Sequence, residues 1–189
     1  MVSLKYAKEY RLDTFTDERG KVKDCTVYIG PLYEWSMPEE QRKRLRGRLT
    51  VMTIGQAVLF ISSIWNYNDL SRLWWVMLPY ACLLFVFLYL ATVCYNLFTV
   101  KGQFHREQKD KTVDRMKACS VMGAILTGSS FLSATISLLA GLVHIQMWDV
   151  WFIITEAVLL TVFLYEAKLS KLLQVRELPN PQAAEWKDK

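Results

Sequence analysis

Apolar residues are concentrated in four long segments of the chain, which polar connections separate. The segments cover about residues 49–66, 73–99, 119–145 and 148–167. Each approaches or exceeds the roughly 20 residues that a helix needs to cross about 30 Å of hydrocarbon at 1.5 Å per residue. The pattern therefore predicts an all-α membrane protein with four transmembrane helices in a bundle. The composition agrees, because 52% of the 189 residues are hydrophobic.

The positive charges predict how these spans are oriented. Of the 23 Lys and Arg residues, 11 precede the first span, six lie in 101–118 and five follow the fourth span. Because Lys and Arg are retained on the cytoplasmic side during insertion, both termini are expected in the cytoplasm. The plasma membrane is the expected location. The net charge of +5 is attributed to this topology and to anionic lipids, with no nucleic acid as a partner.

Tryptophan, which favours the headgroup region, supports this orientation. Five of the seven Trp residues cluster at the predicted outer ends of the spans, opposite the basic segments. They are Trp65, Trp74, Trp75, Trp148 and Trp151.

A different pattern precedes the first span. Residues 9–16 and 21–29 are rich in Thr, Tyr, Val and Phe, and they flank the turn-forming sequence "DERG" at 17–20. The pattern predicts a short cytoplasmic β-hairpin. Its second arm has an apolar face that a two-stranded unit cannot bury alone. The hairpin is therefore expected to contact the membrane surface, the bundle or another protein.

The chain thus divides into three parts. Residues 1–37 form the cytoplasmic segment with the hairpin, and residues 38–178 form the four-helix transmembrane domain with its cytoplasmic helix extensions. One extension continues the fourth span as a helix through "EAKLSKLLQVREL" at 166–178, which has one apolar side. The last part, 179–189, begins with "PNP" and is expected to be a flexible tail.

A dense basic run leads into the first span. It comprises Arg42, Lys43, Arg44, Arg46 and Arg48. Such a run anchors the cytoplasmic end of a span and meets anionic lipid headgroups. The alternative is a dock for a specific lipid or protein.

The third predicted span carries small residues at intervals of three and four. They are Gly123, Thr127, Ser130, Ala134, Ser137 and Gly141. A stripe with this period stays on one side of a slightly supercoiled helix and lets a neighbour approach closely, as membrane helices require. The stripe predicts that span three is the centre of helix packing. A groove for a lipid or substrate is the alternative.

One acid, Glu156, lies well inside the fourth span, while Asp149 and Glu166 lie near its ends. An ionised carboxylate at this depth is costly, so Glu156 is expected to be protonated, paired or hydrated. Its candidate partners are the adjacent Thr155, Gln56 of the first span, and the hydroxyls of the third-span stripe. Either Glu156 binds a proton or cation in a transporter, or it is a neutral hydrogen-bonding group within the protein or at an interface.

No arrangement of residues favours catalysis or a bound metal. The two histidines are isolated, the four cysteines form no CxxC pair, and the chain has neither a glycine-rich phosphate loop nor an HExxH motif. We therefore expect no enzymatic activity and no cofactor. The sequence favours an accessory or assembly subunit of a larger integral membrane complex, which binds other membrane subunits or itself. The alternative is a small proton- or cation-coupled transporter that uses Glu156.

Overall fold

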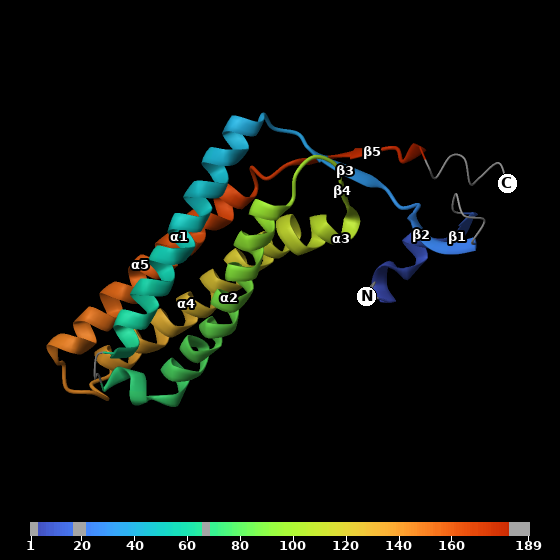
Figure 1. The fold of residues 1–189 in the computed structure, drawn as a ribbon. Helices are drawn as coiled ribbons and strands as arrows, with labels where there is room; N and C mark the ends of the chain where they lie inside the picture. The colour runs from blue at the N-terminus through green and yellow to red at the C-terminus, as the bar shows by residue number, and fades with distance from the viewer. Residues whose placement is uncertain (1–3, 17–21, 66–68, 182–189) are drawn as a thin grey trace.

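The computed structural model describes residues 4–16, 22–65 and 69–181. In these ranges the chain is mostly helical: four long apolar helices lie side by side, and two small sheets lie at one end of them (Figure 1). The turn expected at 17–20 and most of the tail expected at 179–189 fall outside the described residues.

The long helices follow the four apolar segments, and each is long and apolar enough to cross a membrane. Four short helical segments accompany them. The long helices are α1 (Glu39–Trp65), α2 (Trp74–Thr99), α4 (Arg115–Leu139) and α5 (Met147–Ser170). The short ones are η1 (Leu4–Glu9), η2 (Leu70–Arg72), α3 (Arg106–Lys109) and the π-helical η3 (Asp110–Asp114).

Helix α4 is the centre of the bundle, because it packs most extensively against α5 and then against α2. Its small-residue row, defined as Ser120, Gly123, Thr127, Ser130, Ala134 and Ser137, is buried along its length. α5 has a buried row with the same alternation of three and four residues: Asp149, Phe152, Glu156, Leu159, Phe163, Glu166 and Ser170. Rows with this period can stay in contact along two helices. Gly123 shows the fit, since the ring of Phe163 fills the space that a Cβ would take.

The outer surface of the bundle is apolar. Every long helix exposes large apolar side chains, for example Ile54 on α1, Phe85 on α2, Ile125 on α4 and Leu164 on α5. The contact between α4 and α5 buries hydroxyls and carboxyls beside apolar side chains such as Phe163. A water-soluble bundle has a different distribution, because its helices turn apolar stripes toward the core and polar residues toward the solvent.

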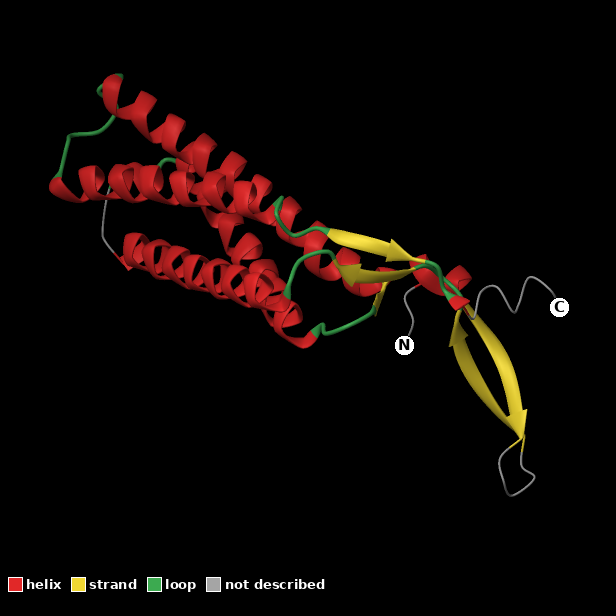
Figure 2. Ribbon diagram, turned by 90° about the horizontal axis from the view of Figure 1, so that it is seen from above, coloured by secondary structure: helices red, strands yellow, loops and turns green. Residues whose placement is uncertain are grey.

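The N-terminal hairpin forms as expected. β1 (Tyr10–Thr16) pairs antiparallel with β2 (Val22–Tyr28), and Tyr10 lies opposite Tyr28 at the end nearer the bundle. Figure 2 shows that the hairpin extends away from the helices, beyond the second sheet.

The second sheet was not expected, and it joins three distant parts of the chain. β3 (Leu32–Trp35) is its central strand, with β4 (Phe104–His105) on one side and β5 (Val175–Leu178) on the other, both antiparallel. The sheet thereby connects the start of α1, the end of α2 and the segment after α5.

The helix expected to continue through 166–178 is interrupted, because α5 ends at Ser170 and β5 follows. Leu173 and Trp35 belong to one buried hydrophobic cluster. Turning the chain after α5 buries Leu173 and lets Val175 pair with Trp35, which a straight helical extension would prevent.

Helix α4 ends at Leu139, whereas the third span was expected to continue to about 145. Gly141 has a φ of 67° and lies just after the helix. Its N–H donates to the carbonyl of Leu138, and the N–H of Leu142 donates to the carbonyl of Ser137, which is the Schellman pattern. Gly141 is exposed and terminates the helix, so it does not extend the small-residue row.

Two glycines of α4 provide a matched test of the α4–α5 fit. Gly123→Ala places a methyl group in the ring of Phe163, whereas Gly128→Ala brings its methyl group no closer than 3.7 Å to Leu160. We expect Gly123→Ala to lower the free energy of unfolding by about 1–3 kcal/mol through overpacking. Gly128→Ala should leave it equal or higher, because Ala favours the helix. Equal losses in thermal unfolding of the purified variants would contradict this packing.

Candidate functional site

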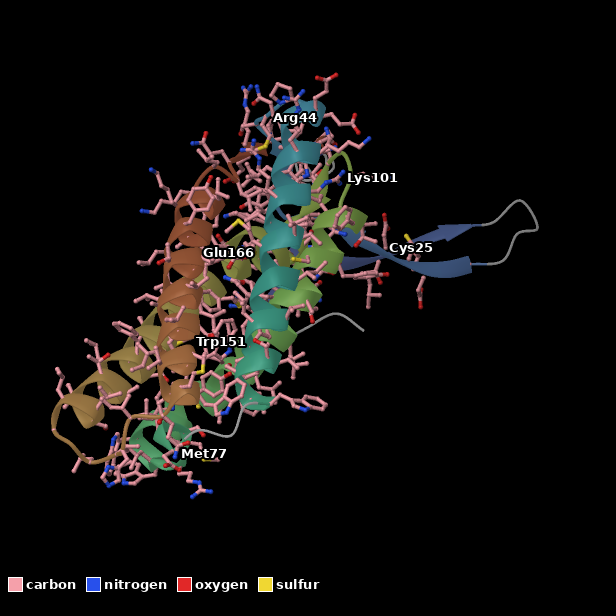
Figure 3. All side chains as sticks on the ribbon, turned by 90° about the vertical axis from the view of Figure 1, so that its left-hand side faces the viewer. Cys25, Arg44, Met77, Lys101, Trp151 and Glu166 are labelled. Carbon is pink, nitrogen blue, oxygen red and sulfur yellow. The ribbon has the colours of Figure 1, made fainter. Side chains whose placement is uncertain are left out.

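Three acids lie on the buried row of α5: Asp149, Glu156 and Glu166, and all three are fully buried. The last two are ten positions apart, which is about 15 Å along the axis of an α-helix. Figure 3 places Glu166 between Trp151 and Arg44 along the bundle. The row therefore holds separate acidic sites at different positions along the helix.

Glu166 is bound by side chains from α1. Thr53 Oγ1 donates to one carboxyl oxygen at 3.2 Å, and Gln56 Nε2 donates to the other at 3.3 Å. All three side chains are buried. Gln56, which was expected as a partner of Glu156, thus pairs with Glu166 and links α1 to α5.

Glu156 has no such partner. Neither of its carboxyl oxygens forms a hydrogen bond with any described residue, although the side chain is fully buried. The nearby Ser130 of α4 interacts with the carboxyl only weakly, and its hydroxyl donates at 3.5 Å to the carbonyl of Val76. Thr127 of α4 is also buried, with its hydroxyl unpaired among the described residues.

The other residue expected beside Glu156 acts locally. Thr155 donates at 2.9 Å to the carbonyl of Trp151 in its own helix. Ser137, in the same small-residue row as Thr127, accepts a hydrogen bond of 3.0 Å from the indole of Trp75. The structure therefore does not assemble Glu156, Gln56 and Thr155 into one site.

Asp149 has a structural role at the opposite end of α5. One of its oxygens accepts from the backbone N–H groups of Asp69 and Leu70 at 3.0 and 3.1 Å, and the other accepts from that of Gln146 at 3.1 Å. The carboxyl thus caps α5 and holds the connection between α1 and α2 against it.

The basic run at the start of α1 divides into two groups. Arg42 is buried over the ring of Trp35 and pairs with Glu39 at 3.7 Å. Arg46 is half-buried, donates at 3.3 Å to the carbonyl of Leu97 and lies over the ring of Phe98. The other three cations, Lys43, Arg44 and Arg48, are exposed.

A polar cluster fixes the hairpin to the bundle. We define this hairpin base as Glu9, Tyr28, His105, Arg106 and Asn180. The Tyr28 ring stacks on His105 at a centroid distance of 3.9 Å, and its hydroxyl donates to Glu9 at 3.0 Å. Arg106 pairs with Glu9 at 3.1 Å, and the Asn180 amide donates at 2.9 Å to the carbonyl of Tyr28.

Two further features support the contacts of the hairpin base. Burial raises the pKa of the Tyr28 phenol above its ordinary value, so the hydroxyl stays protonated and able to donate. Gly30 is required beside it, because a Cβ there would lie 2.6 Å from the Tyr28 hydroxyl oxygen. No local sequence pattern relates these residues, since the contacts join segments far apart in the chain.

The chemical possibilities of these sites are narrow. Among the described residues, no three His, Cys, Asp or Glu side chains are grouped as metal ligands. A buried, unpaired carboxyl such as Glu156 favours its neutral form and can take up or release a proton, or bind a cation if it is hydrated. No protein-family model, no curated protein and no solved structure matches the chain.

Substitution of Glu166 tests whether its hydrogen bonds hold α1 in place. Glu166→Ala removes the acceptor of the buried Gln56 amide and leaves a cavity, while the Thr53 hydroxyl keeps the carbonyl of Leu49 as an acceptor. We therefore expect a loss of about 2–4 kcal/mol in the free energy of unfolding. Glu166→Gln retains the shape and one oxygen and should cost clearly less. Glu156→Gln, which removes no described hydrogen bond, is the control and should change stability least. Equal losses for Glu166→Ala and Glu156→Gln in unfolding experiments would contradict this role.

Proposed function

We propose that this chain is a four-span membrane protein that acts as a non-catalytic accessory or assembly subunit of a larger integral membrane complex. The apolar exterior of the bundle supports membrane insertion. Trp65, Leu132 and Ile136 are at least 60% exposed, and α1, α2, α4 and α5 are all long enough to cross the hydrocarbon core. Such a surface would be unstable in water and is suited to lipid or to neighbouring helices.

The distribution of charge along the bundle supports cytoplasmic termini. Figure 3 places Arg44 and Lys101 near one end and Met77 near the other. The basic end also carries the two sheets, whereas the opposite end carries exposed tryptophans such as Trp65, Trp74 and Trp148. The positive end is the one that is retained in the cytoplasm. The plasma membrane is the membrane that we propose.

The projecting hairpin is the observation that carries the assignment to an accessory subunit. The hairpin base fixes its direction, yet its outer part exposes apolar side chains: Leu12 is 77% exposed and Val22 is 69% exposed. The outer edges of β1 and β2 have no strand partner among the described residues. An exposed edge beside apolar side chains is a suitable surface for an added strand or loop of another protein.

The contacts of the hairpin base are the reason for preferring a partner protein over a loose surface loop. A segment that only covers the bundle would not need the stacking of Tyr28 on His105, the ion pair of Arg106 with Glu9 and the hydrogen bond from the Asn180 amide. Holding the hairpin in one orientation before binding reduces the entropy lost on association. We therefore assign the face of Leu12 and Thr26, which lie opposite each other in the register, as the partner surface.

Crosslinking at Cys25 tests two proposals together: that the hairpin binds a partner protein, and that the N-terminal segment lies in the cytoplasm. Cys25 lies opposite Asp13 and therefore on the other face of the hairpin, where a label leaves Leu12 uncovered. In inside-out native vesicles, a membrane-impermeant maleimide photo-crosslinker should join Cys25 to one stoichiometric membrane partner. Leu12→Asp should lower this yield by about tenfold or more, as loss of an interface anchor does.

The neighbouring substitution Arg11→Asp is the matched control, because this side chain points to the other face of the strand. It should retain most of the crosslink. Sealed right-side-out vesicles should give none, and Cys25→Ser identifies labelling elsewhere. A crosslink only to a second copy of this chain, or an unchanged yield in Leu12→Asp, would contradict the accessory role.

A second candidate function is proton- or cation-coupled transport. One observation favours it: both oxygens of Glu156 are unpaired among the described residues, and the unpaired hydroxyl of Thr127 is buried on the facing helix. A purely structural acid would be expected to have partners, as Glu166 does. In this proposal Glu156 binds the proton or cation, and the hydroxyls of α4 solvate it.

Charge movement after a pH jump tests this second function without knowledge of a substrate. Proteoliposomes on a solid-supported membrane should produce a transient current as Glu156 binds or releases a proton within the membrane. Glu156→Gln should reduce the current by about tenfold, because an amide cannot titrate in this range. The control Glu166→Gln should retain most of it. A wild-type protein without the current, or an unchanged current in Glu156→Gln, would exclude Glu156 as the carrier.

A further inference from the structure

A basic groove lies between the first turns of α1 and the last turns of α5. Its volume is about 430 Å³. It is lined by Lys43, Arg44, Gly47, Arg48, Val51, Met52 and Tyr165. The residues from α1 recur at helical spacing, so the groove follows one face of this helix from the basic end toward the apolar exterior.

The cations of the groove differ from their neighbours in α1. Arg42 and Arg46 are held by contacts within the protein, as described above. Lys43, Arg44 and Arg48 are exposed, and none has an ion pair or a side-chain hydrogen bond with any residue of the described chain. They form a concentrated positive charge without a protein counterion, which complements an anionic group.

Below these cations the wall becomes apolar. Val51 is 69% exposed, and Met52 and the exposed ring of Tyr165 lie beside it. Arg44 and Val51 are seven positions apart, which is about 10 Å along the helix. The order of the groove is therefore charge first and hydrocarbon second, in the direction from the proposed cytoplasmic end into the bilayer.

Gly47 leaves the middle of the groove open. A Cβ added at this position would meet no atom of the described residues within 4 Å, so the groove is open at this point. A second groove of about 530 Å³ adjoins the first, and Arg44 and Arg48 line both. A phosphate bound in either groove would therefore lie beside the guanidinium groups of Arg44 and Arg48.

We propose that this groove is a binding site for one anionic glycerophospholipid. Arg44 and Arg48 bind its phosphate with help from Lys43, and one acyl chain lies over Gly47 against Val51, Met52 and Tyr165. The assignment rests on the proposed membrane insertion. The bound lipid would bridge α1 and α5 at their cytoplasmic ends, beyond the buried link through Glu166.

Lipid exchange in nanodiscs provides the test. The full-length protein is incorporated into discs of phosphatidylcholine with increasing phosphatidylglycerol, and tightly bound lipid is counted by native mass spectrometry after release from the disc. The wild type should retain one phosphatidylglycerol. Arg48→Gln should weaken its apparent affinity by about fivefold, since one basic residue near an anionic headgroup contributes on this order.

Matched variants distinguish lipid binding in the groove from a general effect of surface charge. Lys168→Gln removes the same charge from an exposed position at the same end of α5, outside the groove, and should change the affinity by less than about twofold. Gly47→Leu fills the groove without changing the charge and should displace the lipid. Gly55→Leu, at another open glycine of α1, should not.

The outcomes distinguish the site from the proposed membrane function. If the chain fails to enter nanodiscs, membrane insertion itself is contradicted. If it inserts but retains no phosphatidylglycerol, or if Arg48→Gln and Lys168→Gln lose equal affinity, the lipid site is overturned. Displacement by inorganic phosphate at the same concentration would also overturn it, by showing that the groove binds a free anion without using the acyl chain.

Discussion

The fit between the small-residue row of α4 and the larger side chains of α5 is the constraint on which the bundle depends. In the membrane location that we propose, apolar side chains gain little by leaving lipid for a neighbouring helix, so the helices must associate through close packing and polar contacts. The ring of Phe163 over Gly123 shows how closely the two helices pack. Because α4 also packs against α2, the same helix fixes the positions of two neighbours.

The three buried acids of α5 show how differently one helix can accommodate a carboxyl group. Asp149 is bound by backbone N–H groups, and Glu166 is bound by side chains of α1. Glu156, between them in the chain, has neither. A buried polar group without a partner is costly, and proteins tolerate it mainly where it serves a function. The comparison within one helix separates Glu156 from the two acids whose roles are structural.

Features that repeat over many residues could be predicted from the sequence, and features that depend on distant contacts could not. The four apolar segments predicted the long helices, and the alternating arms around 17–20 predicted the hairpin. The second sheet was missed because β3 and β5 are four residues each and β4 is two, so none has a pattern of its own. Gly141 continued the small-residue spacing, but its positive φ ends the helix there. The pairing of Gln56 with Glu166 also depends on a contact between distant segments. The sequence could therefore identify Glu156 as unusual without showing this pair.

The second sheet makes completion of the fold depend on a segment that is synthesised after the fourth long helix, α5. β3 is made before α1 and β4 after α2, but β5 follows α5. Until β5 arrives, one edge of the central strand remains unpaired, and Asn180 cannot bind the carbonyls of Tyr28 and Gly30. A chain that stops before residue 175 therefore carries an open strand edge and an incompletely held hairpin. The hairpin can therefore reach its final orientation only after α1, α2, α4 and α5 have been synthesised.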